Sequence, residues 1–264
     1  MNEGDSTAWR SLASPALLRS LVVAGGVMLI VGVTAHVLVT LTTVTGFARA
    51  LASQFSRLFY AGTEFTVWAW YTAVLMAAVG VTLAIIGLLR HRADAGSSGA
   101  ARSTGTPYVV LAAVALALSV DETAQFHEGL SPVAGMLGLH ELPTFGWLVV
   151  GIPLAIVVGA VLLVVARRID ARLRRGLIIG GALFLFGALV LEGLGGLLAR
   201  SVDLASSPVA ALGYQVLLAV EEGVELAGVL VALAAALAML EVRGGGASVE
   251  LRVRGAGGAA SVEA

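Results

Sequence analysis

Residues 108–128 read Y-V-V-L-A-A-V-A-L-A-L-S-V-D-E-T-A-Q-F-H-E, an apolar run that ends in a group of ionisable side chains. The apolar part has the character of a membrane-spanning helix, whereas Asp121, Glu122, His127 and Glu128 stand where such a helix normally holds leucine. Ionisable groups at membrane depth are costly and by default mark a functional site. The stretch therefore predicts a membrane protein with a polar site inside its helix bundle.

The composition of the whole chain supports a membrane protein. Of 264 residues, 58% are hydrophobic and 12% are charged, which is far from the balance of a soluble domain. The net charge of −1 indicates no nucleic-acid partner. The chain has no cysteine, and all its basic residues apart from histidine are arginine. This excludes disulfides, thiolate metal sites, Schiff-base chemistry and a Walker-type phosphate loop.

Six apolar segments are long enough to cross a bilayer as helices, which predicts an all-α bundle of six transmembrane helices. The segments are residues 16–44, 65–89, 107–128, 145–166, 176–199 and 208–240. The membrane domain is thus expected over 16–240, with a flexible N-terminus at 1–15. The Gly-rich tail over 241–264 is expected to be disordered.

Three shorter patterns complete the organisation of the chain. Residues 45–64 place an apolar stripe among polar positions, which predicts an amphipathic helix lying in the outer interface. Residues 90–106 are rich in Gly, Ser and Ala and predict a flexible linker. Trp68 and Trp147 lie near the starts of predicted spans and fit an aromatic belt at the membrane surface.

The positions of the arginines predict the orientation of the bundle. With alternating spans, every arginine except Arg49, Arg57 and Arg200 falls on the side of the two termini. Arginine accumulates on the cytoplasmic side of membranes, so both termini are expected there. We therefore expect a multi-pass protein of the cell inner (plasma) membrane, with the lipid bilayer as its partner. A homo-oligomer is an open alternative.

With this topology, the polar residues of the spans fall in the outer half of the bilayer and near its midplane. The candidate site residues are Asp121, Glu122, His127, Glu128, Glu192, Glu221, Glu222, Glu225 and His36. No arginine lies at the depth of residues 221–225, so protons or a cation must cancel their charge. The set predicts a site for a divalent metal ion or for protons, and a lipid-like ligand is the alternative.

Helical geometry divides the first cluster. Asp121, Gln125 and Glu128 follow the i, i+4, i+7 spacing of one helix face, and Glu122 flanks them. His127 points about a third of a turn away from Asp121 on a regular helix. We therefore expect His127 to join Asp121 only if the helix frays near Gly129.

Two resemblances bear on the cluster. The pattern S-V-D-E-x-x-x-x-H-E at 119–128, with L-E-G-L-G-G at 191–196 and E-E-G-V-E-L-A-G at 221–228, resembles a group of bacterial multi-pass membrane proteins of unassigned function. That resemblance implies that these residues act together. Separately, E-G-V-E at 222–225 is similar to half of the R-E-G-x-E motif of iron permeases, with Glu221 in place of the arginine and no second copy.

Three functions fit these observations. The first is transport of a cation, either a divalent metal or a proton, through the carboxylate cluster. The second is an intramembrane metal-dependent hydrolase that acts on a lipid-like substrate, with a glutamate as base. The third is a structural or sensory membrane protein whose acidic core is protonated.

Overall fold

The computed structural model of the protein describes residues 8–95, 104–139, 144–245 and 248–254. It is predominantly helical, which confirms the predicted helical class. Five helices within these ranges are long and apolar enough to cross a membrane: Pro15–Leu41, Val67–Ala95, Thr106–Ala124, Leu148–Ala166 and Ala171–Ser201. This set of helices is compatible with a multi-pass membrane protein.

The elements are named in chain order. The helices are α1 (Pro15–Leu41), α2 (Gly46–Phe59), α3 (Val67–Ala95), α4 (Thr106–Ala124), the 3₁₀ turn η2 (Glu128–Leu130), α5 (Ser131–Met136), α6 (Leu148–Ala166), α7 (Ala171–Leu185), the π-helical segment η3 (Phe186–Leu191), α8 (Glu192–Ser201) and α9 (Pro208–Leu237). The strands are β1 (Arg10–Ser11), β2 (Leu240–Gly245) and β3 (Ser248–Val253).

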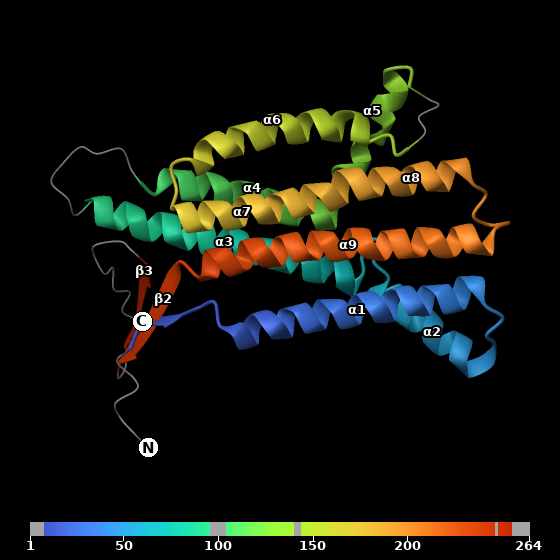
Figure 1. The fold of residues 1–264 in the computed structure, drawn as a ribbon, viewed down its shortest axis with the longest axis horizontal. Helices are drawn as coiled ribbons and strands as arrows, with labels where there is room; N and C mark the ends of the chain where they lie inside the picture. The colour runs from blue at the N-terminus through green and yellow to red at the C-terminus, as the bar shows by residue number, and fades with distance from the viewer. Residues whose placement is uncertain (1–7, 96–103, 140–143, 246–247, 255–264) are drawn as a thin grey trace.

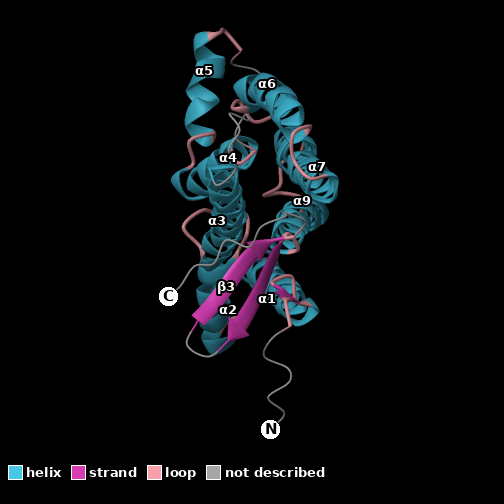
Figure 2. Cartoon of the chain, turned by 90° about the vertical axis from the view of Figure 1, so that its left-hand side faces the viewer, coloured by secondary structure: helices cyan, strands magenta, loops and turns pink. Residues whose placement is uncertain are grey.

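The long helices lie side by side along one axis and alternate in direction (Figure 1). The closest neighbours are α3 with α4 and α7 with α9, and α9 also packs against α1 and α3. Viewed from the end that carries the sheet, α3 and α4 lie on one side and α7 and α9 on the other (Figure 2). Helix α9 therefore joins the two halves of the bundle.

Glycine allows the closest approach between α7 and α9. A Cβ atom added to Gly180 would lie 2.5 Å from the carbonyl oxygen of Gly228. A Cβ added to Gly228 would lie 2.5 Å from the carbonyl oxygen of Gly180 and 2.7 Å from the backbone nitrogen of Phe184. The two backbones are thus in contact, as small residues permit between membrane helices.

The outer surface of the bundle is apolar. Ile30, Ile156 and Val161 expose 68%, 66% and 54% of their surface. Such a surface would be unfavourable in water and is what a helix presents to lipid. The largest fully buried side chains include Leu83, Ile86 and Leu173.

The tail was expected to be disordered from residue 241, and this prediction is wrong for residues 241–245 and 248–253. They form the hairpin β2–β3, and β2 also pairs with β1, so the two ends of the chain meet in one antiparallel sheet. Glu241 accepts hydrogen bonds from Arg252 at 2.8 Å and Arg254 at 2.9 Å. These bonds lower the pKa of Glu241.

Residues 1–7 and 255–264 lie outside the described residues, whereas Arg10 and Ser11 belong to the sheet and not to a flexible segment.

Three predicted helix boundaries were also wrong. Helix α3 continues to Ala95, so the predicted linker over 90–106 begins later, and residues 96–103 of it lie outside the described residues. Helix α7 begins at Ala171 because the Asp170 side chain caps it by accepting from the backbone of Arg172 and Leu173. Helix α4 ends at Ala124, four residues earlier than expected.

The contact between α7 and α9 yields a test of the packing. Gly180→Ala should lower the free energy of unfolding by about 1–3 kcal/mol, because the added carbon must push two backbones apart. Thermal unfolding in detergent measures the effect. The matched control is Gly181→Ala, where an added Cβ has no neighbour within 4 Å. Equal melting temperatures for the two variants would contradict the packing.

Candidate functional site

Helix α3 supplies hydrogen-bond donors to two carboxylates on different helices. The indole nitrogen of Trp68 donates to Glu222 of α9 over 2.8 Å. One turn later, the hydroxyl of Thr72 donates to Glu122 of α4 over 2.7 Å. Residues four apart lie on the same face of a helix. A single face of α3 therefore holds the carboxylates of α4 and α9 at one level of the bundle.

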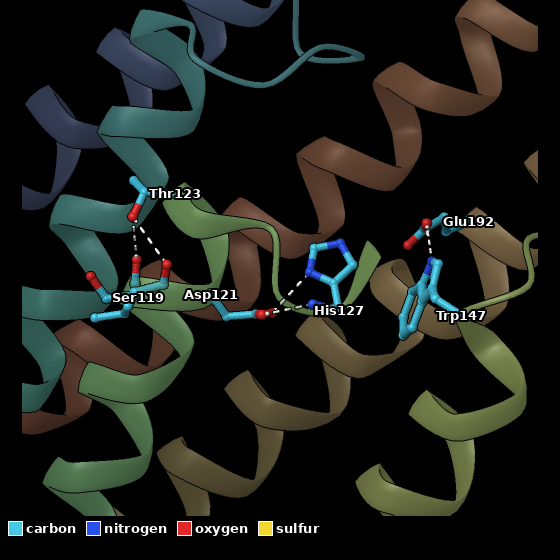
Figure 3. Close-up of polar contacts among 7 residues, drawn as sticks. Ser119, Asp121, Thr123, His127, Trp147 and Glu192 are labelled. Atoms are coloured by element: carbon cyan, nitrogen blue, oxygen red, sulfur yellow. Dashed lines mark hydrogen bonds and ion pairs between the residues drawn. The ribbon is translucent and has the colours of Figure 1, made fainter. Parts of the chain in front are cut away.

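A third carboxylate is held in the same way. The indole nitrogen of Trp147 donates to Glu192 of α8 over 2.8 Å (Figure 3). Trp68 and Trp147 expose only 1% and 7% of their surface. The prediction that these two tryptophans anchor the protein in an aromatic belt is therefore wrong. Indole has one donor and no acceptor, so it suits a buried carboxylate.

Asp121 and His127 form a pair where α4 ends. Gln125 adopts a left-handed conformation with φ 56° and ends the helix, so the chain turns back on itself. The backbone nitrogen of His127 then lies 3.0 Å from Oδ1 of Asp121, and the ring nitrogen Nδ1 of His127 lies 2.9 Å from Oδ2 of Asp121 (Figure 3). The expectation that His127 needs an irregular helix end is met, although the break falls at Gln125 and not near Gly129.

The His127 ring also faces the third carboxylate. It packs edge-on against Trp147, with 5.0 Å between the ring centres. The hydrogen bond to Asp121 raises the pKa of His127, which favours the charged imidazolium. His127 thus connects the end of α4 with the Trp147–Glu192 pair.

The glutamates of α9 lie within electrostatic range of those on the other helices. Glu225 interacts with Glu222, Glu122, Glu221 and Glu192. Among the residues that the structure describes, no arginine forms a hydrogen bond or ion pair with any of these five carboxylates. Within the described part of the chain, the positive charge that approaches the cluster is therefore that of the His127 ring.

A π-helical segment between α7 and α8 lets their backbone pack closely against the glutamates of α9. An added Cβ on Gly187, within η3, would lie 2.4 Å from Cγ of Glu225 and 3.1 Å from the carbonyl oxygen of Glu221. Farther along, an added Cβ on Gly195 would lie 3.8 Å from Oε2 of Glu221. π-Helical turns are rare and often occur at functional sites. Here the turn and its glycines bring the backbone against the carboxylates.

His36 lies apart from the carboxylates. Its ring stacks on Tyr60 with 3.7 Å between centres, and its Nδ1 lies 3.3 Å from the hydroxyl of Ser56. Burial raises the pKa of Tyr60 to about 12, so this residue stays a neutral phenol at neutral pH. Tyr60 in turn neighbours Gln215 of α9. The side-chain oxygen of Gln215 is buried and has no hydrogen-bond partner among the described residues.

The structure therefore brings together most of the predicted site residues. Glu122, Glu192, Glu221, Glu222 and Glu225 form the cluster, and the Asp121–His127 pair borders it. Glu128 is exposed at the start of η2. Within the described ranges, no three His, Asp or Glu side chains are placed so that they could hold a metal ion.

Several participating residues were missed from sequence. Trp68, Thr72 and Trp147 are donors, and Glu64 lies near Glu122 in the segment between α2 and α3. Trp68 and Thr72 share the spacing of one helix face, which could have drawn attention to them. No signal in the sequence distinguishes a tryptophan that meets a carboxylate from one that meets lipid headgroups.

Removal of the indole donor tests the site geometry. Trp68→Phe leaves Glu222 without its partner and should lower the free energy of unfolding by about 1–3 kcal/mol. Trp70→Phe is the control because Trp70 is 61% exposed. Thermal unfolding of Trp68→Phe with and without Glu222→Leu, which removes the acceptor, separates the hydrogen bond from the lost ring volume. Additive effects of the two changes would argue against the bond.

Glu64 gives a test with pH. Burial and the neighbouring Glu122 and Glu128 raise the pKa of Glu64 from 4.5 to about 7. A carboxyl group with a raised pKa stabilises the fold while it is protonated, and this contribution is lost as pH rises from about 4.5 to about 7. The melting temperature of the wild type should therefore fall between about pH 4.5 and about pH 7, and that of Glu64→Gln should fall less over the same pH range. Parallel curves for wild type and variant would show that Glu64 ionises normally.

Comparison with known proteins places the chain in a family. No curated protein and no solved structure matches it. The family model described as "Domain of unknown function (DUF8692)" matches residues 8–240. The match extends from before β1 to the first residue of β2 and includes every residue of the carboxylate cluster. The chain belongs to the DUF8692 family.

Proposed function

We propose that the protein is a carrier of the plasma membrane that binds a proton or small cation at its carboxylate cluster and moves it across the bilayer. The observation that supports this most directly is the set of five glutamates, none of which has an arginine partner among the residues that the structure describes. Ionised carboxylates in a medium of low dielectric need a compensating charge. Each of three of them accepts one neutral hydrogen bond, which orients the group without cancelling its charge.

In this proposal α9 is the sixth span, and both termini are cytoplasmic. Helix α9 has 30 residues, roughly 45 Å at 1.5 Å per residue, which is enough to cross a bilayer. Its three glutamates face neighbours in the bundle and not lipid. The pairing of β1 with β2 supports termini on one side of the membrane. The arginine distribution supports the cytoplasmic side.

The carboxylates offer a route from the surface into the bundle. Glu64 and Glu128 lie outside the long helices, Glu64 between α2 and α3 and Glu128 at the start of η2. Glu122 and Glu192 follow, and Glu222 and Glu225 lie deeper along α9. Neighbouring members of the series interact electrostatically. A series of carboxylates suits the stepwise transfer of a proton.

A proton fits the geometry better than a divalent metal ion. Within the described residues, no three candidate ligands converge on one point. A proton needs only one carboxylate at a time, whereas Mg²⁺ and Ca²⁺ need several oxygen ligands together. Proton transfer is therefore the form of transport that we propose.

One observation favours a second candidate, a hydrolase that acts on a lipid-like substrate. Asp121 holds His127 through Nδ1 and favours its imidazolium form, which leaves Nε2–H to act as a general acid. This is the arrangement by which a carboxylate orients a catalytic imidazole. Turnover of a lipid ester that His127→Gln abolishes would support this candidate over transport.

Proton flux into liposomes tests the proposal. Purified protein is reconstituted with a pH-sensitive dye inside, and a potassium diffusion potential drives protons inward. The wild type should acidify the lumen at least tenfold faster than Glu222→Gln or Glu225→Gln. Glu250→Gln, which alters the sheet and not the bundle, should behave as wild type. A wild-type rate equal to that of empty liposomes would overturn the proposal and favour a structural or sensory role.

A further inference from the structure

The connection between α6 and α7 carries a concentrated positive charge. Five of the nine residues over 167–175 are arginine, and Asp170 is the one acidic residue among them. The side chain of Asp170 caps α7 by accepting from the backbone nitrogens of Arg172 and Leu173. Among the described residues, no carboxylate forms an ion pair with any of the five arginines. The connection is therefore a positive patch that the described part of the chain does not neutralise.

Arginines from both helices gather in one small area of this patch. Nη1 of Arg174 donates to the carbonyl oxygen of Arg167 over 3.5 Å. The side chain of Arg174 therefore reaches back from α7 to the end of α6. Arg167 and Arg168 are exposed there, whereas Arg174 is half-buried.

A further arginine joins the patch from α3. The guanidinium carbon of Arg90 lies 5.1 Å from the centre of the Tyr108 ring. The hydroxyl of the same tyrosine accepts a hydrogen bond from the backbone nitrogen of Asp170 over 3.3 Å. Tyr108 is only 2% exposed. This ring therefore fixes the Arg90 guanidinium close to the start of α7.

The Arg90 side chain also offers a buried donor. Its Nε is buried and has no hydrogen-bond partner among the described residues. A buried donor without a partner costs the free energy of its lost hydration. The planar guanidinium group can donate two parallel hydrogen bonds to phosphate oxygens. The donors at this end of the bundle therefore suit an anion with several oxygen acceptors.

An apolar groove reaches the same connection. It measures about 390 Å³, is formed by α3, α4, α6, α7 and α9, and is lined by apolar residues. Its lining includes Ala166, the last residue of α6, and Leu177 of α7. Arg167 follows Ala166 directly, and Arg174 lies three residues before Leu177, a spacing that makes two residues neighbours on a helix surface. The apolar walls therefore suit a hydrocarbon chain and end where the arginines begin.

We propose that this end of the bundle binds an anionic phospholipid, with its phosphate against Arg90, Arg167 and Arg174 and one acyl chain in the groove. The arginines select the charge of the head, and the groove selects a molecule that has a chain. In the orientation proposed above, the patch lies on the cytoplasmic side, where anionic lipids are abundant. The site uses none of the carboxylates of the cluster, so it does not depend on proton transport.

Competition for radiolabelled dipalmitoylphosphatidylglycerol tests the proposal. The label is bound to the full-length protein in detergent at low salt and then displaced by unlabelled lipids. Dipalmitoylphosphatidylcholine, which has the same chains on a zwitterionic head, should bind roughly tenfold more weakly than dipalmitoylphosphatidylglycerol. Inorganic phosphate at the same concentrations should displace none of the label, because it has no chain.

Arginine variants test the head of the lipid. Arg90→Gln should weaken binding of the anionic lipid about fivefold. The double variant Arg167→Gln/Arg174→Gln should weaken it further, and it serves as the test if Arg90→Gln does not fold. Arg19→Gln is the control, because Arg19 is an exposed arginine near the start of α1. The control should keep the affinity of the wild type.

Glycine variants test the chain. Gly159 lines the groove, and a Cβ added to it would meet no atom within 4 Å. Gly159→Leu should therefore occupy the groove and weaken lipid binding about tenfold, as if roughly two methylene groups had left it. Gly213→Leu is the matched control, since Gly213 also has free space around its Cβ but is not part of the lining.

Four results would overturn the proposal. They are equal affinity for the two lipids, displacement of the label by inorganic phosphate, full affinity in Gly159→Leu, and a loss in Arg19→Gln as large as that in the variants of the patch. The last result would show a general attraction between charges. Proton flux in liposomes decides the proposed function separately, because it depends on Glu222 and Glu225 and lipid binding does not.

Discussion

The arrangement of the bundle depends on the requirement that a carboxylate inside a membrane must meet a donor, a proton or a cation. Helix α3 meets part of this requirement by presenting Trp68 and Thr72 on one face, toward Glu222 and Glu122. These two hydrogen bonds join three helices at the same level. Because neither donor carries a charge, the bonds fix position and leave the electrostatic requirement unsatisfied. In the proposed function, the same contacts that orient the helices leave the cluster available for a cation.

Much of the helical arrangement could be predicted because apolar length is a strong signal in a chain of this composition. The end of α4 could not be predicted, because the helix breaks at Gln125. Glutamine, unlike glycine, has no preference for the left-handed conformation, so the sequence gives no signal of the break. The sheet was missed because glycine-rich sequence normally indicates disorder, and the pairing with Arg10 and Ser11 is a contact between opposite ends of the chain.

The acidic residues of the candidate site were predicted from the sequence, but the side chains that donate hydrogen bonds to them were missed. Carboxylates in a membrane helix are conspicuous, so the cluster on α4, α8 and α9 could be found from sequence alone. Trp68 and Trp147 were taken as interfacial because most tryptophans near span ends are. Only the packing shows that they are buried and point at Glu222 and Glu192. His36 was grouped with the acids by depth, although depth alone does not set the direction in which a side chain points.

The π-helical segment between α7 and α8 affects more than its own six residues. A π turn accommodates one residue more than the α-helix around it. Each residue turns an α-helix by about 100°, so η3 offsets the register of everything that follows. Glu192 faces Trp147, and Gly195 faces the side chain of Glu221, because of that offset. A chain one residue shorter between 186 and 191 would form a regular helix and rotate Glu192 and Gly195 by about 100° away from Trp147 and Glu221.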